Sequence, residues 1–247
     1  LVSFEDIFTK MEKLEVLKYK TLVFDCDGVI LNSNKLKTEA FYQAALPYSE
    51  TAAQALVDYH VQNGGISRYR KFEYFLENIV GECNKSEILD DLLSAYASSV
   101  RSGLLECSVA PGLVKLRNHL SDTRWLVASG GDQAELRQVF AAKGIDHLFD
   151  GGIFGSPDTK EHILLREKER GNIITPALFL GDSRYDYIAA SQAGLDFIFV
   201  SGWSEMKRWL DFCTELNLNY IQSVDMLTPL VINSIGNKNS DNHTGFA

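Results

Sequence analysis

Hydrophobic and polar positions follow two different patterns along this chain. Between residues 34 and 102 the apolar positions recur at the spacing of amphipathic helices. From residue 111 onward, helix-like segments alternate with short apolar runs rich in β-branched and aromatic residues. One further run, 21–26, precedes the helical region. Repeated β and α units with apolar strands predict an α/β fold with a doubly wound, Rossmann-like parallel sheet.

The pattern also predicts the individual elements and the domains. Predicted strands cover 21–26, 124–129, 152–154, 177–181 and 196–201. Predicted helices cover 3–17, 34–46, 49–62, 67–80, 86–102, 111–121, 132–143, 160–170, 185–193 and 205–215. The helical stretch interrupts the alternation directly after the first strand. We therefore predict a discontinuous core domain (1–32 and 109–232), a helical cap domain (33–108) and a flexible polar tail (233–247).

The first predicted strand ends in two carboxylates, in the sequence Asp25-Cys26-Asp27-Gly28. Since strand side chains alternate in direction, Asp25 and Asp27 can lie on the same side, with Cys26 opposite. Two carboxylates held this close repel each other and need a cation or a shared proton. Mg²⁺ binds such oxygen ligands well. The alternative is an acidic strand end that simply leads into a turn, because Asp and Gly are common turn residues.

Later strand ends also carry residues suited to chemistry. Ser129-Gly130-Gly131-Asp132 follows one strand and precedes a helix, where main-chain N–H groups can bind a phosphate, although Ser and Asp also cap helices. Asp182 follows another strand and can meet the first two carboxylates around one ion, with Asp186 about one helical turn further on. Lys160 begins a helix, where a positive charge is unfavourable because it opposes the helix dipole. An acidic site nearby would compensate for this and give the lysine a reason to be there.

The order D-x-D-G-V, S-G-G, Lys, G-D-S-x-x-D resembles the haloacid dehalogenase superfamily of phosphatases and phosphomutases over residues 20–201. The resemblance implies that Asp25 is the nucleophile, which forms an aspartyl phosphate. It implies that Asp27 is the general acid and then the general base, and that its main-chain carbonyl is a ligand of Mg²⁺. By the same resemblance Asp182 completes the metal site, and Asp186 orients Lys160 or a metal-bound water.

For the remaining motifs, the resemblance implies that Ser129 and the Gly130 amide hold the phosphoryl oxygens and that Lys160 neutralises negative charge. The dehalogenase branch lacks the second Asp, because halide leaves without a proton whereas an alkoxide needs one. Asp27 therefore favours phosphoryl transfer. Glu161 stands where relatives often have proline, and Gly181-Asp182 stands where many mutases have a Glu-Asp pair, which leans toward hydrolases.

The predicted cap contains a loop, Gly65-Ile66-Ser67-Arg68, that resembles the Gly-Val-Ser-Arg cap loop of β-phosphoglucomutase-like proteins. The resemblance implies that Arg68 binds a substrate phosphate, which suits the fork geometry of a guanidinium. The alternative is a solvated arginine that opens a helix rich in basic residues, including Arg70 and Lys71. Weaker candidates for the same pocket are Lys35, Lys37 and Asn63.

Composition narrows the possible partners. The 247 residues carry a net charge of −9, which argues against a nonspecific nucleic-acid or anionic-membrane surface. No apolar segment approaches a membrane span, and the four cysteines show no zinc or disulfide pattern. The five histidines have no ligand spacing, so we expect them in core or surface positions. We expect a cytoplasmic monomer or homodimer that acts on a small phosphorylated metabolite.

Three functions remain open at this point. The leading hypothesis is a Mg²⁺-dependent phosphatase that hydrolyses a small phosphomonoester, with a sugar phosphate preferred. A sugar phosphomutase of the β-phosphoglucomutase type would use the same chemistry and return the phosphoryl group to the sugar. The third hypothesis, from another class, is a noncatalytic metabolite-binding protein that retains the fold.

Overall fold

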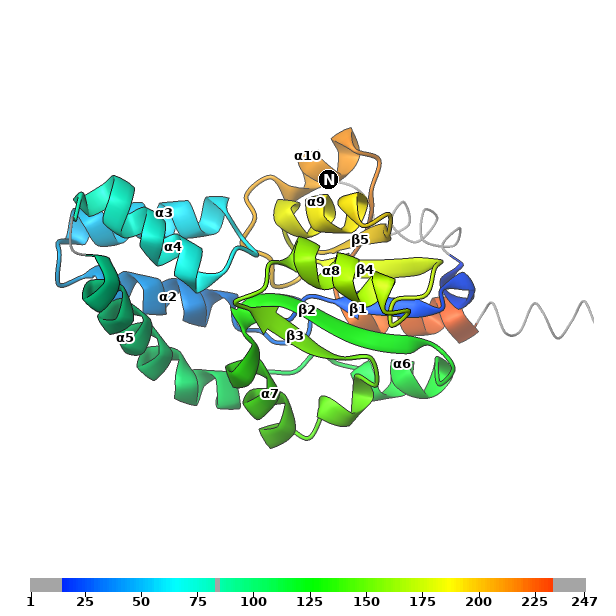
Figure 1. Ribbon diagram of the computed structural model, residues 1–247. Coiled ribbons are helices and arrows are strands. Elements are labelled where there is room, and N and C mark those ends of the chain that lie inside the picture. Colours follow the sequence, from blue (N-terminus) through cyan, green and yellow to red (C-terminus); the bar gives the residue numbers. More distant parts are fainter. Residues whose placement is uncertain (1–14, 83–84, 233–247) are drawn as a thin grey trace, which may run out of the picture.

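A six-stranded parallel sheet forms the centre of the structure, a computed structural model that describes residues 15–82 and 85–232 (Figure 1). Its strands are β1 Thr21–Phe24, β2 Arg124–Asp132, β3 Gly152–Ser156, β4 Ala177–Gly181, β5 Asp196–Val200 and β6 Asn219–Ile221. They lie in the order β3-β2-β1-β4-β5-β6, and every neighbouring pair is parallel. The predicted α/β class and doubly wound sheet are thus confirmed.

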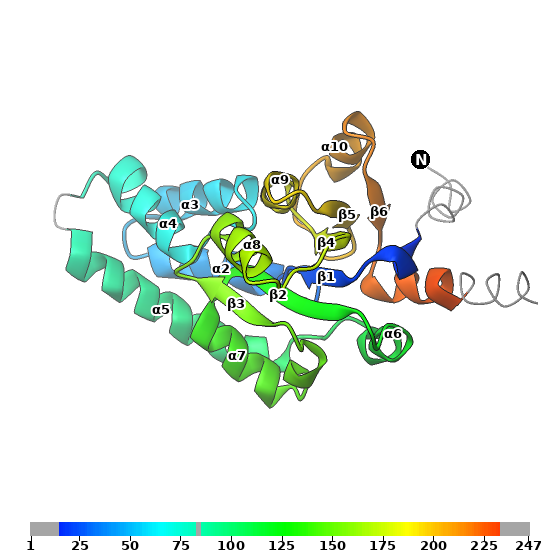
Figure 2. The same ribbon diagram turned by 45° about the vertical axis from the view of Figure 1, so that its right-hand side comes forward.

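Helices cover both faces of the sheet (Figure 2). Leu22 and Phe24 of β1 pack into one apolar cluster, and Val23 between them packs into another, as strand alternation requires. The first cluster includes side chains of α6 (Leu113–His119), α7 (Gln133–Ala142) and residues 224–231. The second includes side chains of α8 (Lys160–Glu169) and α9 (Arg184–Gln192), and α10 (Trp209–Glu215) packs on β5 through a third. Burial on both faces explains why these strands are apolar throughout.

A helical insertion between β1 and β2 gathers beyond one end of the sheet (Figures 1 and 2). It consists of α2 (Asn34–Ala45), α3 (Glu50–Gln62), α4 (Arg68–Tyr74), a π-helical segment Phe75–Val80 and α5 (Lys85–Glu106). Its interior is aromatic: the ring of Phe41 lies 5.1 Å from that of Phe72 and 4.5 Å from that of Tyr96, centroid to centroid. These contacts give the insertion a packed centre of its own.

The two segments that join the insertion to the sheet lie side by side. Leu31 and Val109 form an antiparallel bridge, Asn32 N donates to Ser108 O at 3.0 Å, and Ala110 N donates to Ile30 O at 2.8 Å. The insertion is therefore attached through a paired, two-stranded connection.

The strand order places β1 between β2 and β4, where the direction of winding reverses. Ligands of open α/β sheets bind at this switch point, beyond the carboxyl ends of the strands. Phe24 at the end of β1 lies opposite Val127 and Leu180, and Asp25 N donates to Leu180 O at 2.9 Å. The residues that follow β1 and β4 and the last residues of β2 therefore lie together at the edge that faces the insertion.

Some predicted boundaries differ from the structure. Strand β6 was not predicted, because three residues between polar neighbours carry little pattern. Helix α10 begins at Trp209, not at residue 205, because the preceding loop is held elsewhere: Ser204 Oγ donates to Asp182 O at 2.6 Å, and Trp203 O accepts from Asn34 Nδ2 at 2.9 Å. The predicted helix 3–17 lies mostly outside the described residues, and the predicted tail 233–247 lies entirely outside them. Among the described helices, none is long and apolar enough to cross a membrane.

Candidate active site

A buried ion cluster lies at the carboxyl end of β1. Lys160 Nζ lies 2.9 Å from Asp25 Oδ1 and also contacts Asp186 Oδ1. All three residues are at most 2% exposed. Lys160 is the first residue of α8, and the two carboxylates explain how a buried ammonium is tolerated at a helix N-terminus.

Asp186 is held in place by the start of its own helix. Its Oδ2 accepts hydrogen bonds from Asp182 N, Ser183 N and Ser183 Oγ, while Ser183 Oγ accepts from Asp186 N. This reciprocal capping box begins α9. With one oxygen used by the cap and the other by Lys160, Asp186 serves to position Lys160 against Asp25.

Asp25 and Asp182 leave oxygen atoms available for a cation. Carboxylate oxygens of Asp25, Asp182 and Asp186 all lie within 4.8 Å of one another. Burial raises the pKa of Asp25 to about 7; Lys160 opposes that rise, and Asp186 and Asp27 add to it. Burial, followed by the charges of Asp25 and Asp186, also raises the pKa of Asp182 well above its usual value. A single ammonium facing three buried carboxylates leaves negative charge that a divalent, oxygen-binding cation would balance.

Gly28 makes the approach of these two strand ends possible. It has a φ of +78°, and a Cβ built there would lie 2.1 Å from Asp182 Oδ2. Asn34, at the start of α2, donates to the same Asp182 oxygen at 2.7 Å. The turn after β1 therefore needs glycine both for its backbone conformation and for space.

The Asp27 side chain points toward the insertion and binds there. Its carboxylate accepts from Lys37 Nζ at 2.6 Å and from Ser33 Oγ at 2.5 Å. Burial by itself would raise the pKa of Asp27, but Lys37 and Ser33 together lower it below its ordinary value. The sequence predicted that the side chains of Asp25, Asp27 and Asp182 would share one site; in the structure the carboxylate of Asp27 is bound by Lys37 and lies outside the cluster of Asp25, Asp182 and Asp186.

The last residues of β2 lie against the loop between α3 and α4 of the insertion. Ser129 is fully buried, and its Oγ accepts from Gly131 N at 3.0 Å. A Cβ on Gly130 would lie 2.2 Å from the main-chain oxygen of Gly65, so the two backbones meet where no side chain fits. Asp132 caps α7 through a 2.9 Å hydrogen bond from Glu135 N, as its position before the helix suggested.

Arg68 lies near the same end of β2, and its guanidinium is already paired. Both terminal nitrogens bind the Glu135 carboxylate of α7, at 3.1 Å for Nη1 and closer for Nη2. The guanidinium also lies 4.7 Å from the centre of the Tyr96 ring. Arg68 is 6% exposed, so the alternative that it is solvated is wrong. Its predicted contact with a substrate phosphate stays a prediction.

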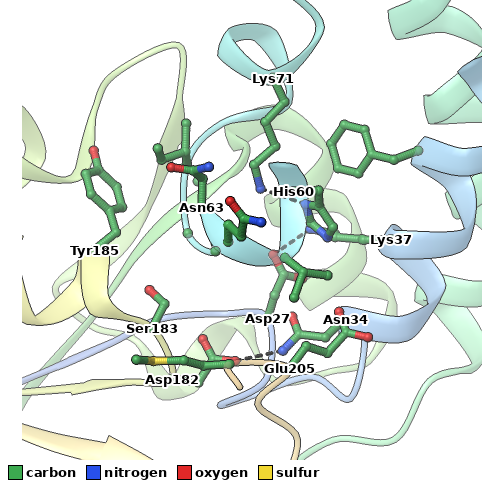
Figure 3. A pocket seen from close by; sticks show the side chains of 18 of the residues that line it. Asp27, Asn34, Lys37, His60, Asn63, Lys71, Asp182, Ser183, Tyr185 and Glu205 are labelled. Carbon is green, nitrogen blue, oxygen red and sulfur yellow. Dashed lines mark hydrogen bonds and ion pairs between the residues drawn. The ribbon is translucent and has the colours of Figure 1, made fainter. Parts of the chain in front are cut away.

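A cavity of about 690 Å³ lies between the strand ends and the insertion (Figure 3). Its lining includes Asp25, Asp27 and Asp182 from the sheet side and Lys37, Asn63 and Arg68 from the insertion. Two of the three weaker candidates, Lys37 and Asn63, thus line it, whereas Lys35 is exposed and is absent from the lining.

Two further residues, His60 and Lys71, line the cavity although other positions were predicted for them. His60 lines it, although core or surface positions were expected for the histidines, and its Nδ1 lies 2.7 Å from Lys71 Nζ. Lys71 is only 2% exposed, although its basic neighbours suggested a solvated helix face. Packing of α4 against the aromatic centre of the insertion turns Lys71 inward, which no local spacing revealed.

Comparison with solved structures shows the same fold in several proteins. A predicted phosphatase from Clostridium acetobutylicum is 21% identical, with a TM-score of 0.67 over 87% of this chain and 99% of that one. CbbY from Rhodobacter sphaeroides in complex with phosphate is 19% identical, with a TM-score of 0.62 over 85% and 96% of the two chains. A CbbY variant in complex with xylulose-(1,5)-bisphosphate is 18% identical, with a TM-score of 0.61 over 84% and 95%. At these identities the likeness concerns the fold.

Sequence comparison gives the family. No curated protein sequence matches the chain. The family model described as haloacid dehalogenase-like hydrolase matches residues 19–194, which include β1 through α9 and every residue of the ion cluster. The chain therefore belongs to the haloacid dehalogenase-like hydrolases.

Proposed function

We propose that this protein is a Mg²⁺-dependent phosphatase that hydrolyses a small phosphomonoester through an aspartyl phosphate. The observation that supports it most is the position of Asp25: it lies at the switch point of the sheet, lines the cavity, and is bound by Lys160 and close to Asp182. Relatives of the fold include a predicted phosphatase and a protein crystallised with phosphate.

The residues around Asp25 suit a magnesium ion. The carboxylates of Asp25 and Asp182 would hold it together with the main-chain carbonyl of Asp27, whose side chain is bound elsewhere. Hard oxygen ligands and uncompensated negative charge are what Mg²⁺ prefers. When bound, the ion would offset the repulsion between an anionic nucleophile and an anionic phosphoryl group.

In the first half of the reaction, a carboxylate oxygen of Asp25 attacks phosphorus, and the bond from phosphorus to the ester oxygen breaks. Asp27 gives its proton to the departing alkoxide. Lys160 reduces the negative charge on Asp25. The Gly130 amide, in the cavity lining, would donate to the phosphoryl oxygens together with the hydroxyl of Ser129, which is buried behind that lining. In the second half, Asp27 takes a proton from water, which attacks phosphorus and releases phosphate and Asp25.

The contacts of Asp27 favour its role as a base. Lys37 stabilises the ionised carboxylate, and this is the form that accepts a proton from water. To act as an acid, Asp27 must take up a proton while the ammonium of Lys37 is beside it. Displacement of Lys37 by substrate, or movement of the insertion that carries Lys37, would allow that.

The insertion, residues 33–108, would act as a cap over the reaction. It supplies one wall of the cavity, and polar contacts join it to the sheet side, among them Lys37 with Asp27, Asn34 with Asp182, and Arg68 with Glu135. Such contacts break more easily than an apolar interface, which suits a cap that opens for substrate and closes to exclude water.

The test is phosphate release from a panel of phosphorylated metabolites in MgCl₂. We expect release by the unaltered protein and loss of at least about 1,000-fold in kcat for Asp25→Asn, because the nucleophile is removed. Asp122→Asn, an exposed Asp beyond α6, is the matched control. Equal activity of the two variants would reject Asp25 as the nucleophile.

The same assay separates the other hypotheses. An isomerised sugar phosphate without free phosphate would identify a phosphomutase. Binding without turnover across the whole panel would identify a noncatalytic metabolite-binding protein.

A further inference from the structure

Lys71 differs from the other buried cations of the described chain. Lys37, Arg68 and Lys160 each contact a carboxylate, namely those of Asp27, Glu135 and Asp25. Lys71 is equally buried, but within residues 15–82 and 85–232 it forms its polar contact with the neutral ring of His60 and not with a carboxylate. Burial of an ammonium without a counter-ion is costly. A buried lysine that lacks a carboxylate partner therefore suggests that an anion from outside the chain supplies the missing charge.

The hydrogen bonds around His60 determine that its Nδ1 is an acceptor and that Lys71 is the donor to it. Thr38 Oγ1 donates its single proton to Glu205 Oε2 at 2.6 Å, because a carboxylate can only accept. His60 Nε2, 3.1 Å from Thr38 Oγ1, must therefore be the donor in that pair. This leaves Nδ1 as an acceptor, and Lys71 donates to it.

This relay fixes the Lys71 nitrogen at the wall of the cavity. One N–H is used by His60, and among the described residues the other two hydrogens of the ammonium have no acceptor within hydrogen-bond distance. In Figure 3 Lys71 and His60 lie on one side of the cavity, and Asp27 and Asp182 lie on the other. A ligand that fills the space between them contacts both groups.

Burial, with the charge of Lys37 next, lowers the pKa of Lys71 to about 7. An anion placed against Lys71 would reverse that effect and hold the ammonium form. Arg68 is less suited to receive the same anion, because two of its nitrogens already bind Glu135.

We propose that Lys71, positioned by His60, binds a second anionic group of the substrate, so that the substrate is a phosphomonoester with a carboxylate or a second phosphate at its far end. This inference rests on the proposed phosphatase function for the placement of the first phosphate at Asp25. It narrows the substrate class from phosphomonoesters in general to those with two anionic ends.

The test compares matched substrates that differ in the second anion. Suitable pairs are phosphoglycolate with ethyl phosphate, 3-phosphoglycerate with glycerol 3-phosphate, 6-phosphogluconate with glucose 6-phosphate, and glucose 1,6-bisphosphate with glucose 6-phosphate. For at least one pair we expect kcat/KM to be about tenfold or more higher for the doubly anionic member, the effect of a charge-assisted hydrogen bond. In Lys71→Met that ratio should fall toward one, and Lys71→Arg should restore part of it.

Two further readouts exclude a merely structural role. Lys115→Met, which removes an exposed lysine on α6, is the control and should keep the ratio of the unaltered protein. Because Met has a similar volume and no charge to bury, Lys71→Met should unfold at the same temperature as the unaltered protein or a higher one. An unchanged ratio in Lys71→Met, or no preference for the doubly anionic member in any pair, would overturn the inference.

Failure of the phosphatase proposal has a different signature. If neither the panel nor p-nitrophenyl phosphate releases phosphate, the proposed function is rejected, and the same pairs can then be titrated calorimetrically without turnover. Tighter binding of a doubly anionic member that is lost in Lys71→Met would still support the second anion site. Equal binding of both members would reject that site as well.

Discussion

Replacement of Asp25 by Asn should change how stability depends on pH. In the metal-free protein the pKa of Asp25 is about 7, against 3.8 for an unperturbed Asp. A raised carboxyl pKa means that the folded state binds more protons than the unfolded state between these values. The contribution of Asp25 to stability therefore increases as the pH falls through 7 and decreases as it rises.

The size of the effect follows from the two pKa values. Between about pH 8 and about pH 5 the folded carboxyl becomes protonated while the unfolded one stays ionised, which corresponds to about 2.5 kcal/mol. Asp25→Asn removes this contribution. The free energy of unfolding of the unaltered protein minus that of the variant should therefore rise by about 2.5 kcal/mol as the pH falls from about 8 to about 5.

Urea unfolding in EDTA, followed by circular dichroism at several pH values, measures both proteins. Use of the difference matters, because other buried groups titrate in the same range: burial lowers the pKa of His60 and that of Lys71, and both act in the opposite direction. A difference that stays constant with pH would refute the assignment of a raised pKa to Asp25. MgCl₂ at about pH 8 should stabilise the unaltered protein more than the variant, because the ion would use this carboxylate.

Three further substitutions test the contacts around the cavity. Gly28→Ala should lower stability by about 1–3 kcal/mol and weaken Mg²⁺-dependent activity, since its Cβ would meet Asp182; Gly144→Ala, with φ of +66° and open space around it, is the matched control for urea unfolding. Lys37→Met should cost about 3 kcal/mol and raise the pKa of Asp27, which moves the acidic limb of the pH–rate profile upward, whereas exposed Lys35→Met should do neither. Glu135→Gln should loosen α4, seen as faster amide hydrogen exchange there and unchanged exchange in β1; equal exchange in both proteins would contradict a role of the Arg68 pair in holding the insertion.

The sheet and the residues at its strand ends were predictable because local sequence determines them. Apolar runs predict the strands, and Asp25 and Asp182 follow two runs that lie next to each other once winding from β1 in both directions is assumed. The helical insertion was equally visible, since no β-rich run interrupts residues 34–102. These features depend on periodicity and on strand order, both of which the sequence contains.

The insertion side of the cavity was less predictable. Whether Lys71 faces solvent or the cavity depends on how α4 packs against α2 and α5. The sequence around Lys71 contains no pattern that indicates this packing. The contacts of His60 with Thr38 and Lys71 join α3 to α2 and α4, so neither spacing nor composition could pair them. Asp27 was recognised from its motif, but the partner of its side chain, Lys37, depends on where α2 begins.

Asp25 is hydrogen-bonded to the sheet, whereas Asp27 is bound by residues of the helical insertion. The main chain of Asp25 is hydrogen-bonded to β4, whereas the carboxylate of Asp27 is bound by two residues that lead into and lie on α2. A swing of the insertion about its two-stranded connection would therefore either break the contacts of Asp27 with Lys37 and Ser33 or move its carboxylate relative to Asp25. In the proposed mechanism, an open cap would leave the nucleophile Asp25 in register with the sheet while the acid Asp27 has lost its alignment or its partners, so two residues of one short loop would couple the reaction to closure of the cap.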